Sequence, residues 1–251
     1  MKKAVILFVC LGVLWCGVES AVAQENDKYV ANFDYTPPLE ESLDSSDVTF
    51  TVANTFYKTN SSIFWFSSPQ FANFSKAIQE DLTKILKAKG FSIRGPYESY
   101  DLIPFQDKKA VDLLLLPTVE LTVALKDHKE KAENMWQPAA DQVQTGNAEI
   151  GGKIIMEMKE IATQELMWVK TIPFKNFTFP YFVKVKFKEY ERIKKAGSRG
   201  FYSYDPIFNG MAKGMEEQYP GIMGTIDSLI DPEEIEIIKK QCQELKSKKG
   251  Y

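Results

Sequence analysis

Three lysines and a tryptophan lie close together in the stretch LKDHKEKAENMW. Lys126, Lys129 and Lys131 supply positive charge, and Trp136 supplies a flat aromatic face. Because a cation pairs with a carboxylate and an indole ring stacks on a sugar, these residues are candidates for binding an anionic glycan. Acidic residues alternate with the lysines, however, so the stretch is also compatible with a solvated loop whose charges balance.

A second candidate contact surface is the apolar run IFWF, which interrupts an otherwise polar stretch. Phe64, Trp65 and Phe66 are three bulky aromatic residues where a loop is expected. Exposed, they would form a patch for a protein partner. The alternative is that they are buried, as a plug or an extra strand of the core.

The sequence offers little for catalysis or metal binding. Its single histidine, His128, lies among lysines and glutamates, and no spacing brings it together with Cys242 as a ligand pair. The chain has no nucleophile elbow, no paired-histidine zinc motif and no phosphate-binding glycine loop. Carboxylate pairs such as Glu233-Glu234 are explained by the first turn of a helix. We therefore expect a protein that is not an enzyme and has no cofactor.

Composition and charge favour a globular protein that does not bind nucleic acid. The chain has 251 residues, with 44% hydrophobic and 26% charged residues and a net charge of −3. Arginine is scarce and the lysines are spread along the chain. A basic cluster of the kind that tracks phosphates is therefore not expected.

The first residues have the pattern of a secretory signal peptide. Two lysines precede an apolar run over 4–18, and the small residues Ala21 and Ala23 precede Gln24. The run is shorter than the roughly 20 residues of a membrane-spanning helix. We expect cleavage after Ala23 and export of a soluble body, with Cys242 as its one cysteine and no internal disulfide.

The sequence of the next part of the chain predicts a β-α-β-α-β unit. Residues 48–57 are rich in β-branched and aromatic residues and predict a strand. Ser68 and Pro69 predict the start of an amphipathic helix, and Gly90 its end. A short strand over 91–95, one or two helical turns and a strand over 111–125 follow. The last begins as a continuous apolar run, typical of a strand buried on both faces.

The second half of the sequence predicts a hairpin, an edge strand and helices. We expect a loop over 126–145, then a β-hairpin over 148–174 that turns near residues 162–164. The stretch YFVKVKFKEY alternates apolar residues with Lys184, Lys186 and Lys188, as an edge strand does. A helical C-terminal part follows, with a break or kink at Pro220-Gly221.

Together these elements predict an α/β (α+β) fold with a mixed β-sheet, a β-α-β-α-β unit, a following hairpin and strand, and C-terminal helices. The expected organisation is a signal peptide over 1–23, an extended lead segment over 24–46 and a single α/β domain over 47–251.

The order of these elements resembles the neuraminyllactose-binding haemagglutinin (flagellar sheath adhesin lipoprotein) family. The resemblance covers roughly 29–249 and is carried by ANFDYTPP, LKAKGF, FQDKKAVDLLLLPTVELTV, the hairpin turn ATQE and CQELKSKKG. It implies a bacterial envelope protein, usually an outer-membrane lipoprotein, without catalysis and with sialylated glycans as ligands. The family's sugar-binding basic run would fall at Lys126–Lys131, where this chain has KDHKEK.

The resemblance also raises the question of a lipid on Cys16. Family members carry a lipidated cysteine preceded by a small residue, whereas here Trp15 precedes Cys16. Cleavage after Ala23 is therefore preferred, and attachment to a membrane would come through a partner, or alternatively through a lipid on Cys16.

Two functions follow from the sequence. The first is an exported binding protein of the periplasm, outer membrane or cell surface, whose partner is an anionic glycan or another envelope protein. The alternative is a periplasmic structural or assembly module of the outer membrane or flagellar apparatus that binds no glycan.

Overall fold

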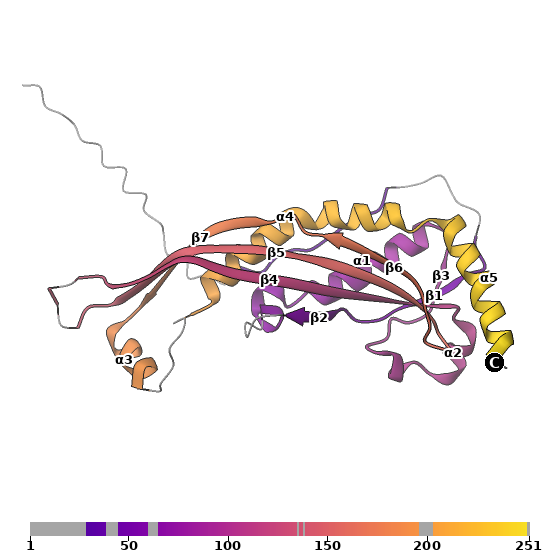
Figure 1. Ribbon diagram of the computed structural model, residues 1–251, viewed down its shortest axis with the longest axis horizontal. Helices are drawn as coiled ribbons and strands as arrows, with labels where there is room; N and C mark the ends of the chain where they lie inside the picture. The colour runs from indigo at the N-terminus through magenta and orange to yellow at the C-terminus, as the bar shows by residue number, and fades with distance from the viewer. Residues whose placement is uncertain are drawn as a thin grey trace, which may run out of the picture.

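The structure is a computed structural model that describes residues 29–38, 45–59, 65–134, 136–137, 139–195 and 203–249. The predicted cleavage residues Ala21, Ala23 and Gln24 lie outside these ranges, as do Cys16 and Phe64. The described part is elongated, with a long twisted sheet along its axis and helices α1 and α4 packed beside it (Figure 1).

The sheet is mixed and seven-stranded. Its main order is β3-β1-β4-β5-β6, with β2 paired to β4 and β7 paired to β5. The pairs among β1, β2, β3 and β4 are parallel, and all pairs with β5 are antiparallel. The strands are β1 (Thr49–Val52), β2 (Phe56–Thr59), β3 (Ser92–Ile93), β4 (Leu113–Ala132), β5 (Gln142–Glu160), β6 (Leu166–Pro173) and β7 (Phe177–Val185).

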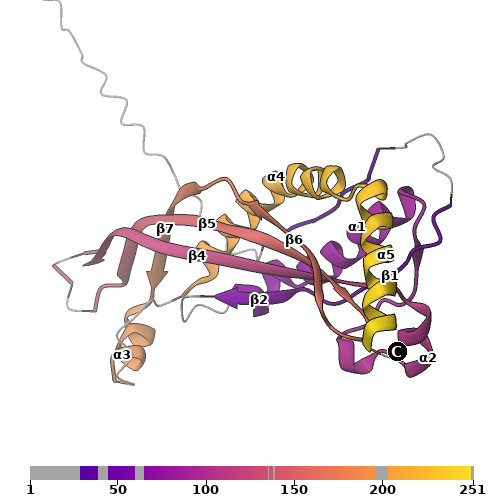
Figure 2. The same cartoon turned by 45° about the vertical axis from the view of Figure 1, so that its right-hand side comes forward.

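The helices complete the α/β fold that the sequence predicts. α1 joins β1 and β2 to β3, and α2 precedes β4, so the predicted β-α-β-α-β order is confirmed. α5 lies at the end of the molecule opposite the long β4–β5 hairpin (Figures 1 and 2). The helices are α1 (Phe74–Ala88), α2 (Phe105–Ala110), α3 (Phe187–Lys195), α4 (Asp205–Leu229) and α5 (Pro232–Lys249), with 3-10 turns η1 (Trp65–Ser67), η2 (Pro69–Phe71) and η3 (Tyr100–Leu102).

The predicted first strand is divided in two, opposite a proline of β4. The Ala53 N–H donates to the Leu115 carbonyl at 3.0 Å, so the backbone groups of Leu115 point toward β1 and β2. Pro117, two residues further along, faces the same side and has no N–H. The interruption over 53–55, between β1 and β2, lies at this missing donor.

The predicted helix forms, but its start differs. Pro69 opens the short turn η2 rather than α1, and the buried Ser68 hydroxyl bonds to none of the described residues. α1 begins at Phe74 and ends as predicted, because Gly90 has a φ of +82°. Its apolar stripe, which includes Ile78 and Leu82, is buried.

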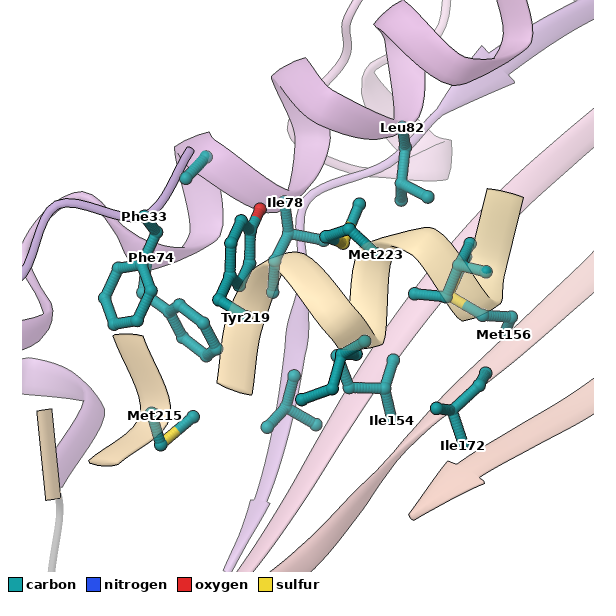
Figure 3. Close-up of a cluster of buried hydrophobic side chains, with 14 of the residues drawn as sticks. Phe33, Phe74, Ile78, Leu82, Ile154, Met156, Ile172, Met215, Tyr219 and Met223 are labelled. Atoms are coloured by element: carbon teal, nitrogen blue, oxygen red, sulfur yellow. The ribbon is translucent and has the colours of Figure 1, made fainter. Parts of the chain in front are cut away.

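The main core lies between the sheet and helices α1 and α4. Figure 3 shows Ile78 and Leu82 of α1, Tyr219 and Met223 of α4, and Ile154 of β5 in one cluster. The lead segment also contributes to this core. Phe33 is buried, with its ring centroid 4.5 Å from that of Phe74 and 5.3 Å from that of Tyr219.

A smaller cluster covers the other face of the sheet at one end. Leu114 of β4 packs there with Ile103 and Val111, from the segment that contains η3 and α2. Its neighbours Leu113 and Leu115 face the main core. This part of β4 is therefore buried on both faces, as its continuous apolar run predicts.

The C-terminal half differs from prediction in two places. Of the predicted break or kink at Pro220-Gly221, the break does not occur, since α4 continues through Pro220 and buried residues such as Tyr219 and Met223 hold both halves of the helix against the core. The edge strand β7 ends at Val185, and Lys188 belongs to helix α3. The hairpin of β5 and β6, by contrast, turns over 161–165 as predicted.

Candidate functional site

The long β4–β5 hairpin projects from one end of the molecule (Figures 1 and 2). We call this projection the arm and define it as β4 residues 122–132, the turn over 133–141 and β5 residues 142–150. β7 pairs with its β5 strand along Gln142–Ile150. The arm contains all four predicted ligand-binding residues: three lysines on β4 and Trp136 in the turn.

The predicted loop over 126–145 is therefore wrong, since most of it is strand. Lys126 pairs with Asn147, and the ladder continues to Ala132 opposite Gln142. The side chains of β4 beyond Leu125 are exposed or half-buried. Without a buried face, the strand has no alternation of apolar and polar residues by which a sequence pattern would reveal it.

A β-bulge brings the three lysines to one face of the arm. Lys126 lies opposite Asn147, Lys129 opposite Thr145 and Lys131 opposite Val143. The three partners are spaced by two residues on β5, so their side chains and those of the lysines share one face. The extra residue lies between Lys126 and Lys129, where Asp127 has a φ of +54°.

The lysines differ in how their charge is balanced. Lys126 forms an ion pair with Glu149 of β5. Lys129 and Lys131 are exposed and form no ion pair with any described residue. The structure thus leaves two of the three predicted lysines available to an external anion.

Trp136 lies at the tip of the arm and is almost fully exposed. Its side chain is 91% exposed, and its backbone N–H donates to Asn134 Oδ1 at 3.0 Å. The turn is closed by a hydrogen bond from the Glu133 N–H to the Asp141 carbonyl at 2.8 Å. A large apolar ring is therefore held away from the core, between the two strands of the arm.

A contact across three strands joins the middle of the arm to β7. The Tyr181 hydroxyl of β7 lies 2.8 Å from Nδ1 of His128, which belongs to the bulge on β4. The Tyr181 ring crosses β5 at Gly146, where a Cβ would overlap the hydroxyl. Burial raises the pKa of Tyr181. His128, the only histidine, is therefore part of a structural contact.

Helix α3 adds a basic face at the same end of the molecule, which the sequence analysis missed (Figure 1). Lys188, Arg192 and Lys195 are exposed and spaced by four and three residues, so they share one side of the helix. Tyr190 and Ile193, on another side, pack against the core. The spacing of the basic residues in KEYERIKK is that of one side of a helix and could have indicated α3. The alternation of apolar residues and lysines just before it, in YFVKVKF, favoured a strand instead.

The predicted partner patch is not exposed at its centre. Trp65 is fully buried, with its ring centroid 4.8 Å from that of Phe71 and 5.2 Å from that of Tyr57. Phe66 is half-buried and stacks on Tyr57 at 5.0 Å. The prediction of an exposed surface is wrong for Trp65, because the aromatic cluster below α1 encloses it; Phe64 lies outside the described residues.

Buried charges elsewhere have structural partners. Asp81 of α1 accepts hydrogen bonds from the Tyr219 hydroxyl at 2.8 Å and from Lys84 Nζ at 2.7 Å. Glu160 is fully buried and pairs with Lys246 of α5 at 3.1 Å. In the described part of the chain, no group of three or more histidine, cysteine or acidic residues is placed to hold a metal ion. Nor do the described helices include one long and apolar enough to cross a membrane.

Comparison with known proteins identifies the fold. No protein-family model matches the chain, and no curated sequence matches it. A solved structure described as a neuraminyllactose-binding hemagglutinin homolog from Helicobacter pylori aligns with a TM-score of 0.56 and 14% identity, over 83% of this chain and 98% of that one. The two proteins share a fold, and the relation between them is distant.

Other solved structures align with much lower TM-scores. A PelC dodecamer from Paraburkholderia phytofirmans aligns with a TM-score of 0.28 and 8% identity, over 73% of this chain and 90% of that one. The LpoB C-terminal domain from Escherichia coli has the same TM-score and 9% identity, over 54% of this chain and 87% of that one.

Proposed function

We propose that this chain is a non-enzymatic, exported protein of the bacterial envelope that works by binding, with the arm as its contact surface. The observation that carries the proposal is the 91% exposure of Trp136 at the end of the long β4–β5 hairpin. A tryptophan held in water contributes nothing to the core, whereas tryptophans dominate the energetics of binding surfaces. The arm presents this residue well away from the body.

The envelope location rests on the N-terminal sequence and on the shared fold. The pattern over 1–23 favours export and cleavage after Ala23, which leaves a lead segment and one α/β domain. The hemagglutinin homolog with this fold is named for binding neuraminyllactose. We carry binding over as a proposal, with the periplasm, the outer membrane or the cell surface as the place of action.

The ligand class that the arm's chemistry favours is an anionic glycan. Lys129 and Lys131 share one face and form no ion pair within the described part of the chain, and Trp136 offers a ring for stacking. Lys126 is occupied by Glu149 and plays a smaller part.

An alternative is a structural or assembly module of the envelope, and the open face of the sheet favours it. Phe56 of β2, Val169 of β6 and Phe182 of β7 are 62%, 50% and 40% exposed. Their registers through β4 and β5 place all three on the sheet face opposite the main core. Phe56 and Val169 lie level with Ile155 and Glu157 of β5, whereas Phe182 lies far along the strand opposite Thr145. The region of Phe56 and Val169 is therefore the candidate surface for another protein.

Cell fractionation followed by glycan binding tests the proposal. The full-length precursor is expected to appear, processed, in the envelope fraction and to bind sialylated glycans on an array. Lys129→Ala/Lys131→Ala and Trp136→Ala should each weaken that binding, whereas Lys240→Ala, an exposed lysine on α5, should not. Protein that remains unprocessed in the cytosol contradicts the proposal.

The array also distinguishes the two functions. The assembly module is expected to bind no glycan on the array. It is expected to co-purify with another envelope protein, and to lose that protein when Phe56 and Val169 are changed to serine.

A further inference from the structure

We infer that the arm end of the molecule docks onto the anionic surface of a lipid bilayer, with Trp136 placed among the headgroups. The inference rests on the proposed function in one respect, since an exported envelope protein works beside membranes. It names a lipid surface as the partner of the arm. The features that carry it are the exposed indole, the cations of the arm and of α3 that pair with no described residue, and the position of Tyr29.

Trp136 has the placement that an interfacial anchor needs. Its ring is 91% exposed and lies in the turn that forms the extremity of the arm (Figures 1 and 2). Tryptophan prefers the boundary between headgroups and acyl chains, because its ring is apolar and its N–H remains hydrogen-bonded. A ring at the end of a projection can reach this depth while the body stays in water.

The cations at this end form an extended surface rather than a single pocket. Lys129 and Lys131 on the arm and Lys188 and Lys195 on α3 are exposed and form no ion pair with described residues. Arg192 lies between the two α3 lysines on the same helix side and pairs with Glu189. Each cation near an anionic bilayer adds to the attraction, so cations on two separate elements act together.

The carboxylates nearest the tip are partly offset by a lysine. Lys184 Nζ lies 2.7 Å from a Glu133 carboxylate oxygen and 3.7 Å from one of Asp141. Contact with Glu133 and Asp141 raises the pKa of Lys184 and keeps it charged. One positive charge between two carboxylates leaves a single net negative charge here, which the cations of the arm and of α3 have to outweigh at an anionic surface.

The spread of these cations favours a surface over one sugar. Lys129 and Lys131 lie opposite Thr145 and Val143, two residues apart on β5, so these two lysines span about 7 Å along the strand. Trp136 lies beyond the end of this pair, and the other cations belong to a separate element, helix α3. A bilayer presents charge over this whole extent.

The first described residue, Tyr29, lies near the root of the arm. Lys213 of α4 lies over its ring at 5.1 Å. This part of α4 packs on β7, where the rings of Phe179 and Phe177 lie against Gly210 and Gly214. The lead segment is therefore anchored close to the surface that we assign to the bilayer.

The test is binding to vesicles, read by tryptophan fluorescence and by sedimentation. The purified exported protein is mixed with vesicles of phosphatidylcholine containing phosphatidylglycerol, and with vesicles of phosphatidylcholine alone. Trp65 and Trp168 are buried, so a blue shift that Trp136→Phe diminishes reports the tip. We expect this shift with the anionic vesicles only, and we expect added salt to reduce it.

Two sets of lysines with equal charge provide the matched comparison. Lys129→Ala/Lys131→Ala/Lys188→Ala should weaken sedimentation with anionic vesicles roughly 100-fold, at about fivefold per cation. The control Lys87→Ala/Lys240→Ala/Lys248→Ala changes exposed lysines of α1 and α5 and should bind as the unaltered protein does. Circular dichroism checks that both triple variants are folded.

The inference is overturned if anionic vesicles do not sediment the protein, or if both triple variants bind equally well. A shift caused by a soluble sialylated polymer but not by vesicles also overturns it, in favour of a glycan, and leaves the proposed function standing. Fractionation that finds the protein in the cytosol overturns the proposed function, whatever the vesicles show.

Discussion

The Tyr181 hydroxyl and His128 Nδ1 lie 2.8 Å apart, although their strands, β7 and β4, are separated by β5. The contact is possible because Gly146 of β5 has no side chain to block the ring. It joins the bulge that arranges the arm lysines to the edge strand that precedes α3.

Removing this contact should loosen the arm. Tyr181→Phe deletes one part-buried hydrogen bond and is expected to lower the free energy of unfolding by about 1 kcal/mol. Gly146→Ala should lower it further, because the ring must move. Urea denaturation gives both values, and hydrogen exchange should show faster exchange in β4 and β7. Unchanged exchange in Gly146→Ala would contradict this role.

The two tryptophans of the predicted surfaces should respond oppositely to truncation. Trp65→Ala opens a cavity in the aromatic cluster and is expected to cost about 3–5 kcal/mol of unfolding free energy. Trp136→Ala removes an exposed side chain and should change it by less than about 0.5 kcal/mol. Thermal and urea unfolding measure both. Equal destabilisation by the two changes would mean that Trp136 packs on the body.

Two glycines of α4 should give opposite results when changed to alanine. A Cβ at Gly214 would overlap the Phe177 ring, so Gly214→Ala is expected to destabilise by about 1–3 kcal/mol. Gly221 is exposed and has open space around it, so Gly221→Ala should stabilise by up to about 1 kcal/mol through helix propensity. The two variants make the same change in the same helix, so they differ only in the surroundings of the added methyl group. A stabilising Gly214→Ala would show that β7 does not pack as described.

The buried Glu160 should make the free energy of unfolding depend on pH in the acid range. Burial alone would raise its pKa, but hydrogen bonds from the Ala162 and Thr163 N–H groups, with the Lys246 ammonium, outweigh burial and hold the pKa below its usual range. A lowered folded pKa stabilises the protein above the unfolded value of about 4.3, and this contribution disappears as pH falls through the folded value.

Glu160→Gln isolates this contribution from that of other carboxylates. The variant should be less stable than the unaltered protein at pH 7, and the difference should shrink once the pH falls below about 4. Urea midpoints across the acid range measure it. A difference that is independent of pH would assign the loss to packing rather than to charge.

Cys242 should be unreactive while the protein is folded. It is 2% exposed, and burial raises the pKa of its thiol to about 11. Because the thiolate is the reactive form, alkylation by a maleimide at pH 8 should be slow in the native protein and rapid in urea. Cys242 is the sole cysteine of a chain that starts at Gln24. Rapid native labelling would indicate that α5 opens from the body.

The sequence predicts those parts of the fold in which burial shapes the residue pattern. The α1 stripe faces the core, Gly90 ends the helix, and the run at Leu113–Leu116 marks a strand covered on both faces. Cys242 is buried, as its helical position predicts.

The sequence did not predict the strands of the arm, and the reason is physical. Beyond Leu125 no described β4 side chain is buried, so apolar and polar residues do not alternate there as they do in a half-buried strand. The residues chosen for glycan binding do lie on one element, but their common face depends on a bulge that composition does not reveal. For Trp65 the sequence left two possibilities open, and the structure selects burial in the core over exposure to a partner.

The isolation of the arm's tip has an evolutionary consequence. A turn closed at its base by Glu133 and Asp141, with its largest side chain in water, can change its residues while the body keeps its stability. Descendants of such a protein could exchange one recognition loop for another on an unchanged scaffold. The same separation makes residues 134–140 a natural place to graft a foreign peptide.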